Sequence, residues 1–420
     1  MTSYRLSSGG LIDRTASLNF KFDGKSFTGH PGDTLASALI ANGVHLMGRS
    51  FKYHRPRGVI TAGAAEPNAL VELREGGRKE ANTRATMIEL YEGLTAQSQN
   101  RWPSLDFDIG AINSLASSMF VAGFYYKTFM WPKSFWEKIY EPIIRKAAGL
   151  GTASKEADPD KYEKAYAHCD LLVIGSGPTG LMAALTAGRS GARVILADES
   201  ARLGGSLLNE REEIDGDSGI AWADGVIAEL GSMPNVTLMP RTTVFGWYDG
   251  NIFGAAERVN DHVIAPSPYE PRQRYWRIIA KKAVLAAGAE ERPVAFGGND
   301  IPGVMLASAM RTYANRYAAA AGKSVVVFTN NDSGYRTARD MKAHGVHVEA
   351  IVDSRSESKA DAGGVPVLRG RRIADVGGKK LAAGIELDDH THIGCDAVAM
   401  SGGWSPIVNL ACHRGGRPAW

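Results

Sequence analysis

The sequence predicts an α/β protein with a small mixed domain at the N-terminus and a larger domain that contains two strand–helix–strand units. Three observations carry this prediction. An apolar run enters a glycine-rich turn and a helical stretch at residues 171–190, and a second strand–helix–strand pattern covers residues 324–353. Near the N-terminus, residues 17–43 read as a hairpin followed by a short helix.

From these patterns we expect three parts of the chain. Residues 15–95 form the small domain, and residues 96–166 form an aromatic-rich connecting segment. Residues 167–420 form the larger domain, with an inserted unit at about residues 300–390.

The composition limits the class of protein. Hydrophobic residues make up 44% of the chain and charged residues 22%, as is typical of globular proteins. The net charge of +3 is too small to predict a nucleic-acid partner. The N-terminus lacks the layout of a signal peptide, and no apolar run is long enough to span a membrane. We therefore expect a cytoplasmic protein without a nucleic-acid or membrane partner.

The residues that usually carry catalysis or metal binding form no recognisable set. Cys169, Cys395 and Cys412 are scattered and give no CxxC pair, which fits a reducing compartment. The histidines form no HxxxH or HExxH pattern, and no GxSxG turn occurs. The sequence thus predicts no metal site and no catalytic residue.

The small domain begins with a hairpin. Residues 17–29 alternate as two strands around an Asp-Gly turn. Residues 33–43 predict a helix that ends at Gly43, and residues 70–73 predict another strand.

The glycine-rich turn has the form GxGxxG and lies between a strand and a helix. Gly175 allows a sharp turn at the strand end, and Gly177 lets a pyrophosphate approach the backbone. Gly180 lets the helix pack close to the strand. The helix N-terminus then offers free N–H groups to phosphate oxygens, so the pattern predicts a dinucleotide site.

A second apolar strand, residues 192–200, ends in acidic residues about 20 positions after the glycines, where a ribose-binding acid belongs. Either Asp198 or Glu199 can accept hydrogen bonds from both ribose hydroxyls. Residues 283–293, AVLAAGAEERP, predict a strand and turn that bring Gly288 back to the dinucleotide.

The second strand–helix–strand unit carries TNNDSG at residues 329–334 in place of a GxGxxG turn. A nicotinamide site in that unit is therefore not favoured. Residues 395–410 are expected to return as a strand to the first unit.

The small domain resembles the β-grasp fold of plant-type [2Fe–2S] ferredoxins, which hold their cluster with C-x4-C-x2-C in one loop. The matching positions in the loop at residues 58–71 are Thr61, Glu66 and Ala69. None of these residues offers a thiolate, so the resemblance implies the fold without the cluster.

The order of motifs in the larger domain resembles the two-dinucleotide flavoproteins with a glutathione-reductase-like fold. Together with SFKYHRPRG (residues 50–58), FTNNDS (328–333) and SGGWSPIVNL (401–410), it resembles the alpha subunits of heterotetrameric sarcosine oxidases over essentially all 420 residues. The alpha subunits of dye-linked proline dehydrogenase, opine oxidase and hydrogen cyanide synthase have similar layouts.

This resemblance implies cofactors and partners. The alpha subunit carries NAD in its glycine-rich fold, with FAD as the alternative that the motif allows equally. FMN lies at the interface with the beta subunit, beta itself binds FAD and oxidises the amine, and gamma and delta complete the assembly. The complex converts sarcosine, tetrahydrofolate and O2 into glycine, methylenetetrahydrofolate and hydrogen peroxide. Because the sequence stops after SGGWSPIVNL, we expect a fragment without the tetrahydrofolate site.

The motif and the resemblance together give the candidate cofactor-binding residues. For the last two of them, plain packing is an equal alternative. The set is Gly175, Gly177, Thr179, Gly180, Asp198, Glu199, Ser200, Ser206 and Val244.

Two further segments have open interpretations. Residues 50–58 are basic and aromatic, and we expect them to hold an internal partner or an anionic cofactor. Residues 100–140 contain eleven aromatic side chains that need burial, either on the chain itself or against another subunit. Residues 152–164 are polar and predict a linker or a surface helix.

Three functions compete on the sequence alone. The first is a non-catalytic, cofactor-carrying subunit of an amine oxidase. The second is a self-sufficient FAD oxidoreductase that uses NAD(P)H at the second unit, and the third is a scaffold whose nucleotide never turns over.

Overall fold

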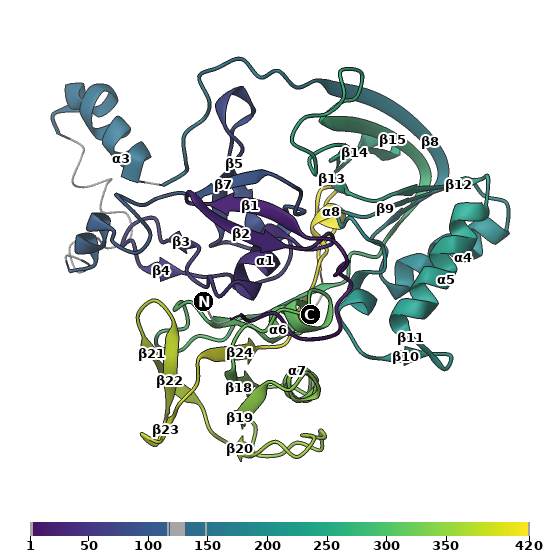
Figure 1. Ribbon diagram of the computed structural model, residues 1–420. Helices are drawn as coiled ribbons and strands as arrows, with labels where there is room; N and C mark the ends of the chain where they lie inside the picture. The colour runs from purple at the N-terminus through teal and green to yellow at the C-terminus, as the bar shows by residue number, and fades with distance from the viewer. Residues whose placement is uncertain (1–2, 116, 118–130, 148, 419–420) are drawn as a thin grey trace.

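The computed structural model describes residues 3–115, 117, 131–147 and 149–418. In Figure 1 the N-terminal domain lies centrally, between a large curved sheet and a second α/β unit that ends the molecule on the opposite side. The chain is thus a mixed α/β protein with the architecture that the sequence predicts.

The N-terminal domain is a five-stranded sheet of order β2-β1-β7-β5-β6, in which β1 and β7 are parallel. Its strands are β1 (Leu18–Phe22), β2 (Lys25–Gly29), β5 (Leu70–Leu73), β6 (Glu80–Arg84) and β7 (Leu94–Ser98). The predicted hairpin is confirmed, with Phe20 opposite Phe27 in the core. This is the β-grasp arrangement, a mixed sheet covered by one helix.

That helix is α1 (Leu35–Ala41), and all of its residues are buried. The Thr34 hydroxyl accepts the Ser37 N–H, and the Ser37 hydroxyl accepts the Thr34 N–H, so a reciprocal capping box starts the helix. Gly43 follows with φ 78°, a conformation that glycine adopts without strain.

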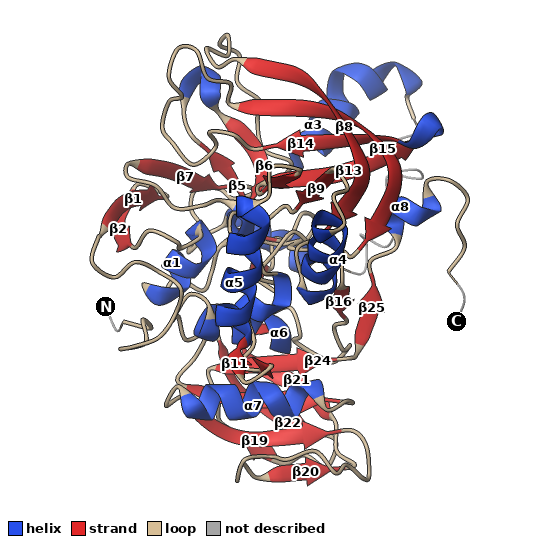
Figure 2. Ribbon diagram, turned by 90° about the vertical axis from the view of Figure 1, so that its right-hand side faces the viewer, coloured by secondary structure: helices blue, strands red, loops and turns tan. Residues whose placement is uncertain are grey.

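The first unit of the larger domain is a six-stranded sheet of order β12-β9-β8-β15-β14-β13. Its strands are β8 (Tyr162–Ile174), β9 (Val194–Ala197), β12 (Val236–Met239), β13 (Thr242–Tyr248), β14 (Ile252–Glu257) and β15 (Gln273–Leu285). Strands β12, β9, β8 and β15 are parallel, and β14 and β13 continue as antiparallel neighbours. Figure 2 shows α4 (Pro178–Arg189) and α5 (Gly219–Ser232) lying side by side against this sheet.

Residues 152–161 form no helix, and β8 begins at Tyr162, before the apolar run that marks it in the sequence. The first half of β8 is largely exposed, because it pairs with β15 outside the core. Exposed strand residues carry no apolar run, so the sequence pattern could not show them.

The second unit is a parallel sheet of order β17-β24-β18-β19-β20. Its elements are β17 (Val304–Leu306), α6 (Ala307–Asn315), β18 (Ser324–Thr329), α7 (Ser333–Ala343), β19 (His347–Asp353), β20 (Val367–Arg369) and β24 (Ala397–Ser401). A small antiparallel sheet joins β21 (Ile373–Gly378), β22 (Ala382–Leu387) and β23 (His392–Ile393).

The expectation that residues 395–410 return as a strand to the first unit is wrong for β24. This fully buried strand lies between β17 and β18 and therefore extends the second unit's sheet to Ser401. An apolar run looks alike whichever parallel sheet it joins. The chain returns only afterwards, when β25 (Trp404–Pro406) pairs with β16 (Ala289–Glu291).

The remaining elements are short. They are β3 (Gly48–Arg49), β4 (Pro56–Arg57), α3 (Glu141–Ala147), β10 (Glu213–Ile214), β11 (Asp217–Ser218) and α8 (Asn409–Cys412). Within the described ranges, no helix is long and apolar enough to cross a bilayer.

The hydrophobic core is divided unevenly. The N-terminal domain and the second unit share one continuous cluster, which includes Phe20 and Leu39 on one side and Tyr313 and Val326 on the other. The first unit has two clusters of its own, one on each face of its sheet. The N-terminal domain is therefore fused to the second unit by apolar packing and meets the first unit mainly through polar contacts.

Candidate nucleotide site

The glycine turn between β8 and α4 has the geometry that its sequence predicts. Gly175 has φ 101°, and a Cβ there would lie 2.4 Å from the Ala286 carbonyl oxygen. A Cβ at Gly180 would lie 1.9 Å from the Gly175 carbonyl oxygen. A Cβ at Gly177 would meet nothing within 4 Å. Two glycines therefore serve close packing of the protein, while the third faces open space.

Helix α4 begins directly at this turn, with Gly177 as its N-cap residue and Pro178 in its first turn. No side chain caps the helix, so no side-chain oxygen accepts a hydrogen bond from its first N–H groups. Thr179 is exposed on the same turn. A helix N-terminus with a glycine at its approach favours an anionic group such as a pyrophosphate.

The turn that follows β15 returns against the glycine turn, as expected. The Ala286 N–H donates to the Ile174 carbonyl at 2.8 Å, and the Ala286 carbonyl is the group that excludes a side chain at position 175. Gly288 follows with φ 72°.

Asp198 lies at the carboxyl end of β9, and protein donors occupy both of its oxygens. One oxygen accepts the Ser176 N–H at 2.7 Å and the Ser176 hydroxyl at 2.8 Å. The other accepts the Ser200 N–H at 2.8 Å. Asp198 therefore ties the glycine turn to the tip of β9, and Ser200 contributes its backbone to the same network.

Glu199, the next residue, is placed differently. Its carboxylate makes no hydrogen bond within the described residues, and it lines a cavity between the first unit and the N-terminal domain. Burial and then the negative charge of Asp198 raise the pKa of Glu199, while Arg258 and Arg84 act against this shift. Of the two acids that the sequence left open, Glu199 is the one whose carboxylate oxygens both lack a donor among the described residues.

Ser206 lies beside the glycine turn because Gly204 and Gly205 pack against it. The Gly204 N–H donates to the Ser176 hydroxyl at 3.1 Å. A Cβ at Gly205 would lie 2.6 Å from the Gly177 Cα. Ser206 itself is exposed in the short helix that follows, Gly205–Leu208.

Val244 packs its side chain into the core of the first unit, so only its backbone can face a ligand. It lies on β13, the edge strand of the sheet, where one row of backbone groups has no strand partner. Its neighbour Thr243 lines the same cavity as Glu199.

The cavity measures about 500 Å³, which is within the range of small-molecule sites. The sequence indicated only one of its lining residues, because the others come from separate segments without a motif. The full lining consists of Ala64, Leu73, Asn82, Thr83, Arg84, Met87, Ile88, Glu89, Glu199, Thr243, Arg258, Asp261 and His262.

The second unit lacks a comparable arrangement. Asp353, at the tip of β19, accepts the Tyr335 hydroxyl at 2.8 Å and pairs with Arg355 at 2.9 Å. A Cβ at Gly334 would lie 2.5 Å from the Thr329 Cβ. The acid that a second dinucleotide would need is thus bound by Tyr335 and Arg355, and the loop is packed against Thr329.

The loop that holds iron in ferredoxins is organised here by a buried carboxylate. Glu66 accepts the backbone N–H groups of Ile60, Thr61, Asn68 and Ala69 at 2.8–3.0 Å. No cysteine occurs in this domain, and the Glu66 oxygens are already saturated. These residues do not fit an iron–sulfur cluster. Across the described parts of the chain, no group of three potential metal ligands occurs.

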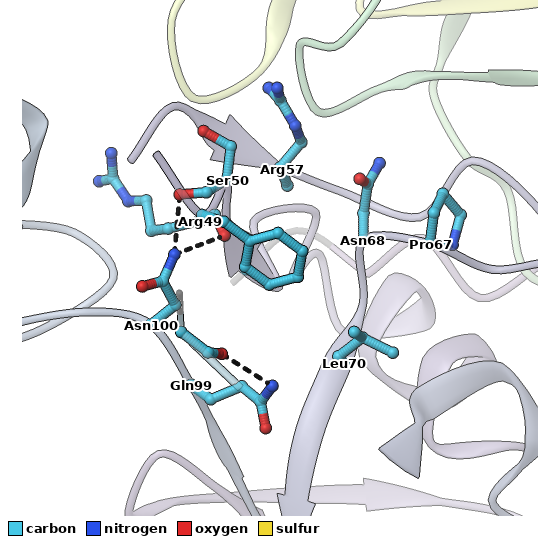
Figure 3. A pocket seen from close by; sticks show the side chains of 11 residues that line it. Arg49, Ser50, Arg57, Pro67, Asn68, Leu70, Gln99 and Asn100 are labelled. Atoms are coloured by element: carbon cyan, nitrogen blue, oxygen red, sulfur yellow. Dashed lines mark hydrogen bonds between the residues drawn. The ribbon is translucent and has the colours of Figure 1, made fainter. Parts of the chain in front are cut away.

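The basic segment at residues 50–58 contacts internal partners. Arg57 pairs with Asp300 of the larger domain at 2.6 Å, and His54 Nδ1 lies 2.6 Å from a buried Asp108 oxygen. A cavity of about 280 Å³ lies beside this segment (Figure 3). On its wall, the Asn100 amide donates to the Ser50 carbonyl at 2.7 Å.

Two family models match the chain. The model for a 2Fe-2S iron-sulfur cluster binding domain covers residues 15–101, and the model for an FAD dependent oxidoreductase covers residues 170–230. The first match agrees with the β-grasp sheet, although the residues that ligate iron are missing. The second spans the glycine turn, the two acids that follow β9, and Ser206.

Among curated proteins, the sarcosine oxidase alpha subunit of Rhizobium meliloti (strain 1021) is 61% identical over 100% of this chain and 43% of its own length. The alpha subunit of the Corynebacterium sp. (strain P-1) sarcosine oxidase is 37% identical over the whole chain and 41% of its own length. One subunit of the opine oxidase of Agrobacterium tumefaciens (strain Ach5) is 33% identical over 44% of the chain and 37% of its own length. The chain therefore spans less than half the length of the curated relatives it matches.

Among solved structures, L-proline dehydrogenase from P. horikoshii superposes with a TM-score of 0.64 at 18% identity. The match covers 96% of this chain and 64% of that chain, and it shows a shared fold. Identity of 61%, 37% and 36% to sarcosine oxidase alpha subunits, over 99–100% of the chain, shows that the chain belongs to the sarcosine oxidase alpha subunit family.

Proposed function

We propose that this chain is the dinucleotide-carrying part of the alpha subunit of a sarcosine oxidase. The observation that carries the proposal is the contrast among the glycines of one turn. Gly175 and Gly180 are needed for packing, whereas Gly177 faces open space at the start of α4. A glycine with no packing reason beside free helix N–H groups fits a site for a pyrophosphate.

NAD is the cofactor that we assign to this turn, and FAD is the alternative. Both share the adenosine diphosphate that the glycines and the acid recognise, so this end of the site does not separate them. When bound, either cofactor supplies hydride-transfer chemistry. The residues of this chain would hold its diphosphate at Gly177, Thr179 and Ser206 and its ribose at Glu199.

Oxidative demethylation of sarcosine is the activity that we assign to the assembled complex. Identity of 61% over the whole chain supports sarcosine over the opines, since the opine oxidase match covers less than half of it. Proline oxidation is the other alternative activity, because the chain shares its fold with L-proline dehydrogenase. We assign the amine oxidation, with its FAD and interfacial FMN, to a site in and beside a beta subunit, as the resemblance to sarcosine oxidases implies. We propose that gamma and delta subunits complete the complex. We expect the complex to lie in the cytoplasm.

The aromatic connecting segment supports a partner subunit. Trp102, Phe107 and Trp131 expose 66%, 68% and 82% of their surface. Side chains of this size usually find cover in an interface. The aromatic residues Phe120, Phe124, Tyr125, Tyr126 and Phe129 lie outside the described residues.

Reconstitution tests this function. Purified chain is mixed with beta, gamma and delta subunits of a sarcosine oxidase, and peroxide formation is measured with sarcosine, proline and an opine as substrates. We expect activity with sarcosine that requires both this chain and the beta subunit. Peroxide formation by the chain alone would contradict a carrier role, and activity with proline or the opine alone would assign the alternative substrates.

A further inference from the structure

We infer that the adenine of the bound dinucleotide lies in the cavity between the first unit and the N-terminal domain, in contact with Arg84 and His262. The N-terminal domain would thereby form one wall of the nucleotide site. This inference rests on the proposed function, because it extends the same site from the glycine turn past the tip of β9.

The position of the cavity follows from the order of groups in a dinucleotide. In a glycine-rich fold the diphosphate lies at the helix N-terminus and the ribose lies at the acidic tip of the next strand, so the adenine lies beyond that tip. Glu199 is at this tip and lines the cavity, and Thr243 lines it from the edge strand β13. The volume of about 500 Å³ is ample for an adenine with part of its ribose.

The polar groups around the cavity have unused capacity. The Nδ1 atom of His262 is buried and has no hydrogen-bond partner. Arg84 forms no ion pair within the described residues and makes one long hydrogen bond, at 3.3 Å, to the Glu66 carbonyl. Buried polar atoms in proteins are normally satisfied, so an orphaned ring nitrogen beside a cavity indicates a ligand that satisfies it.

The two side chains suit an adenine in different ways. A neutral imidazole nitrogen can accept a hydrogen bond from the adenine amino group or donate one to a ring nitrogen. A guanidinium without a carboxylate partner can stack on the face of a purine. Met87, also on the wall, offers an apolar surface to the other parts of the ring.

Two arginines of the first unit, Arg241 and Arg258, bind the N-terminal domain beside the cavity. Arg241 holds both Glu89 oxygens at 2.5 and 2.7 Å. Arg258 donates to the Met87 carbonyl at 2.6 Å and also to the Glu199 carbonyl, so one guanidinium joins the wall to the strand tip. The N-terminal domain also shares an apolar core with the second unit, so this polar interface is not its only attachment to the molecule.

The test measures binding of ADP-ribose, NAD and nicotinamide mononucleotide to the purified chain by calorimetry. We expect Arg84→Ala and His262→Ala each to raise the Kd of NAD and ADP-ribose by about tenfold, as one lost polar or stacking contact does. Binding of nicotinamide mononucleotide should stay unchanged in both variants. Lys21→Ala, at an exposed position of the same domain, is the matched control and should bind as the parent chain does.

A second measurement does not depend on how well the variants fold. The parent chain is irradiated with 8-azido-NAD, whose reactive group is on the adenine, and the labelled peptide is identified by mass spectrometry. We expect label within residues 82–89 or 258–262. Label elsewhere, or unchanged NAD affinity in both variants, would overturn the adenine assignment and leave the proposed function standing. A parent chain that binds neither NAD nor FAD would overturn the proposed function and this inference together.

Discussion

Ser176 donates both its backbone N–H and its hydroxyl to one oxygen of Asp198, at 2.7 and 2.8 Å. The same hydroxyl accepts the Gly204 N–H at 3.1 Å. A single buried serine thus joins the glycine turn, the tip of β9 and the Gly204–Gly205 turn. This arrangement makes Asp198 a structural acid, and we therefore propose that Glu199 binds the ribose.

Replacement of that serine should weaken the fold. Ser176→Ala removes a donor to Asp198 and the acceptor of the Gly204 N–H in a fully buried position. We expect the free energy of unfolding to fall by about 1–3 kcal/mol, measured by urea denaturation. Ser206→Ala, at an exposed serine of the same region, should change it by less than about 0.5 kcal/mol. Equal stability of the two variants would show that the Ser176 network does not support the turn.

The glycines of the turn should separate binding from stability. Gly177→Ala meets no atom within 4 Å and has φ −65°, so the chain should keep its unfolding midpoint while the added methyl group blocks the pyrophosphate. We expect the Kd of NAD to rise at least about tenfold. Gly180→Ala is the matched variant, because its Cβ would lie 1.9 Å from the Gly175 carbonyl oxygen. It should lose about 3 kcal/mol of stability. Unchanged NAD affinity in Gly177→Ala would remove the pyrophosphate from this turn.

Nucleotide binding should depend on pH through Glu199. Ribose hydroxyls donate to a carboxylate, and the pKa of Glu199 is raised by burial, by Asp198 and by Glu290, with Arg258 and Arg84 acting in the opposite direction. Affinity for NAD should therefore be full above the raised pKa and fall as the pH drops through it. Calorimetric titrations at several pH values measure this dependence. Glu199→Gln should bind more weakly at neutral pH and lose the dependence, and a pH profile that survives in this variant would assign it to another group.

His45 should make stability depend on pH in the acidic range. Burial lowers the pKa of His45 to about 4, which the negative charge of Asp396 only partly opposes. The unfolded chain binds a proton near pH 6.5 and the folded chain does not until about pH 4, so stability is full above the first value and falls below it. We expect a loss of about 1.4 kcal/mol per pH unit in this window.

Urea denaturation at pH 7 and pH 5 measures the effect of His45. His45→Phe should reduce the difference in stability between the two pH values. His168→Asn, changed at an exposed histidine of β8, should retain it. The same pH difference in parent and His45→Phe would mean that other groups cause the acid sensitivity.

Local signals in the sequence predicted much of the fold. The hairpin, the capped helix α1 and the GxGxxG turn depend on residues that are close in the chain, and so their geometry follows from turn chemistry and periodicity. The same holds for Glu199, whose place at the end of a buried strand is a local pattern.

Other features depend on contacts between distant segments. Arg84 meets Arg258 and His262 at one cavity, although the two segments are far apart in the sequence and belong to no motif. The use of Asp198 as a structural acid depends on Ser176, 22 positions earlier. The sheet that β24 joins depends on packing around both neighbours, because its buried apolar run fits either unit. Sequence periodicity carries none of these relationships.

Our proposal that the glycine turn of this chain holds NAD can be tested on the purified protein. The most direct test purifies the 420-residue chain and its Gly177→Ala variant, releases any bound ligand with acid, and identifies it by absorbance and mass. We expect NAD without flavin in the parent chain and a large loss of NAD in the variant. FAD in the parent chain would contradict the choice of NAD, and equal amounts of any nucleotide in both chains, or none in the parent even after incubation with NAD and FAD, would contradict the site itself.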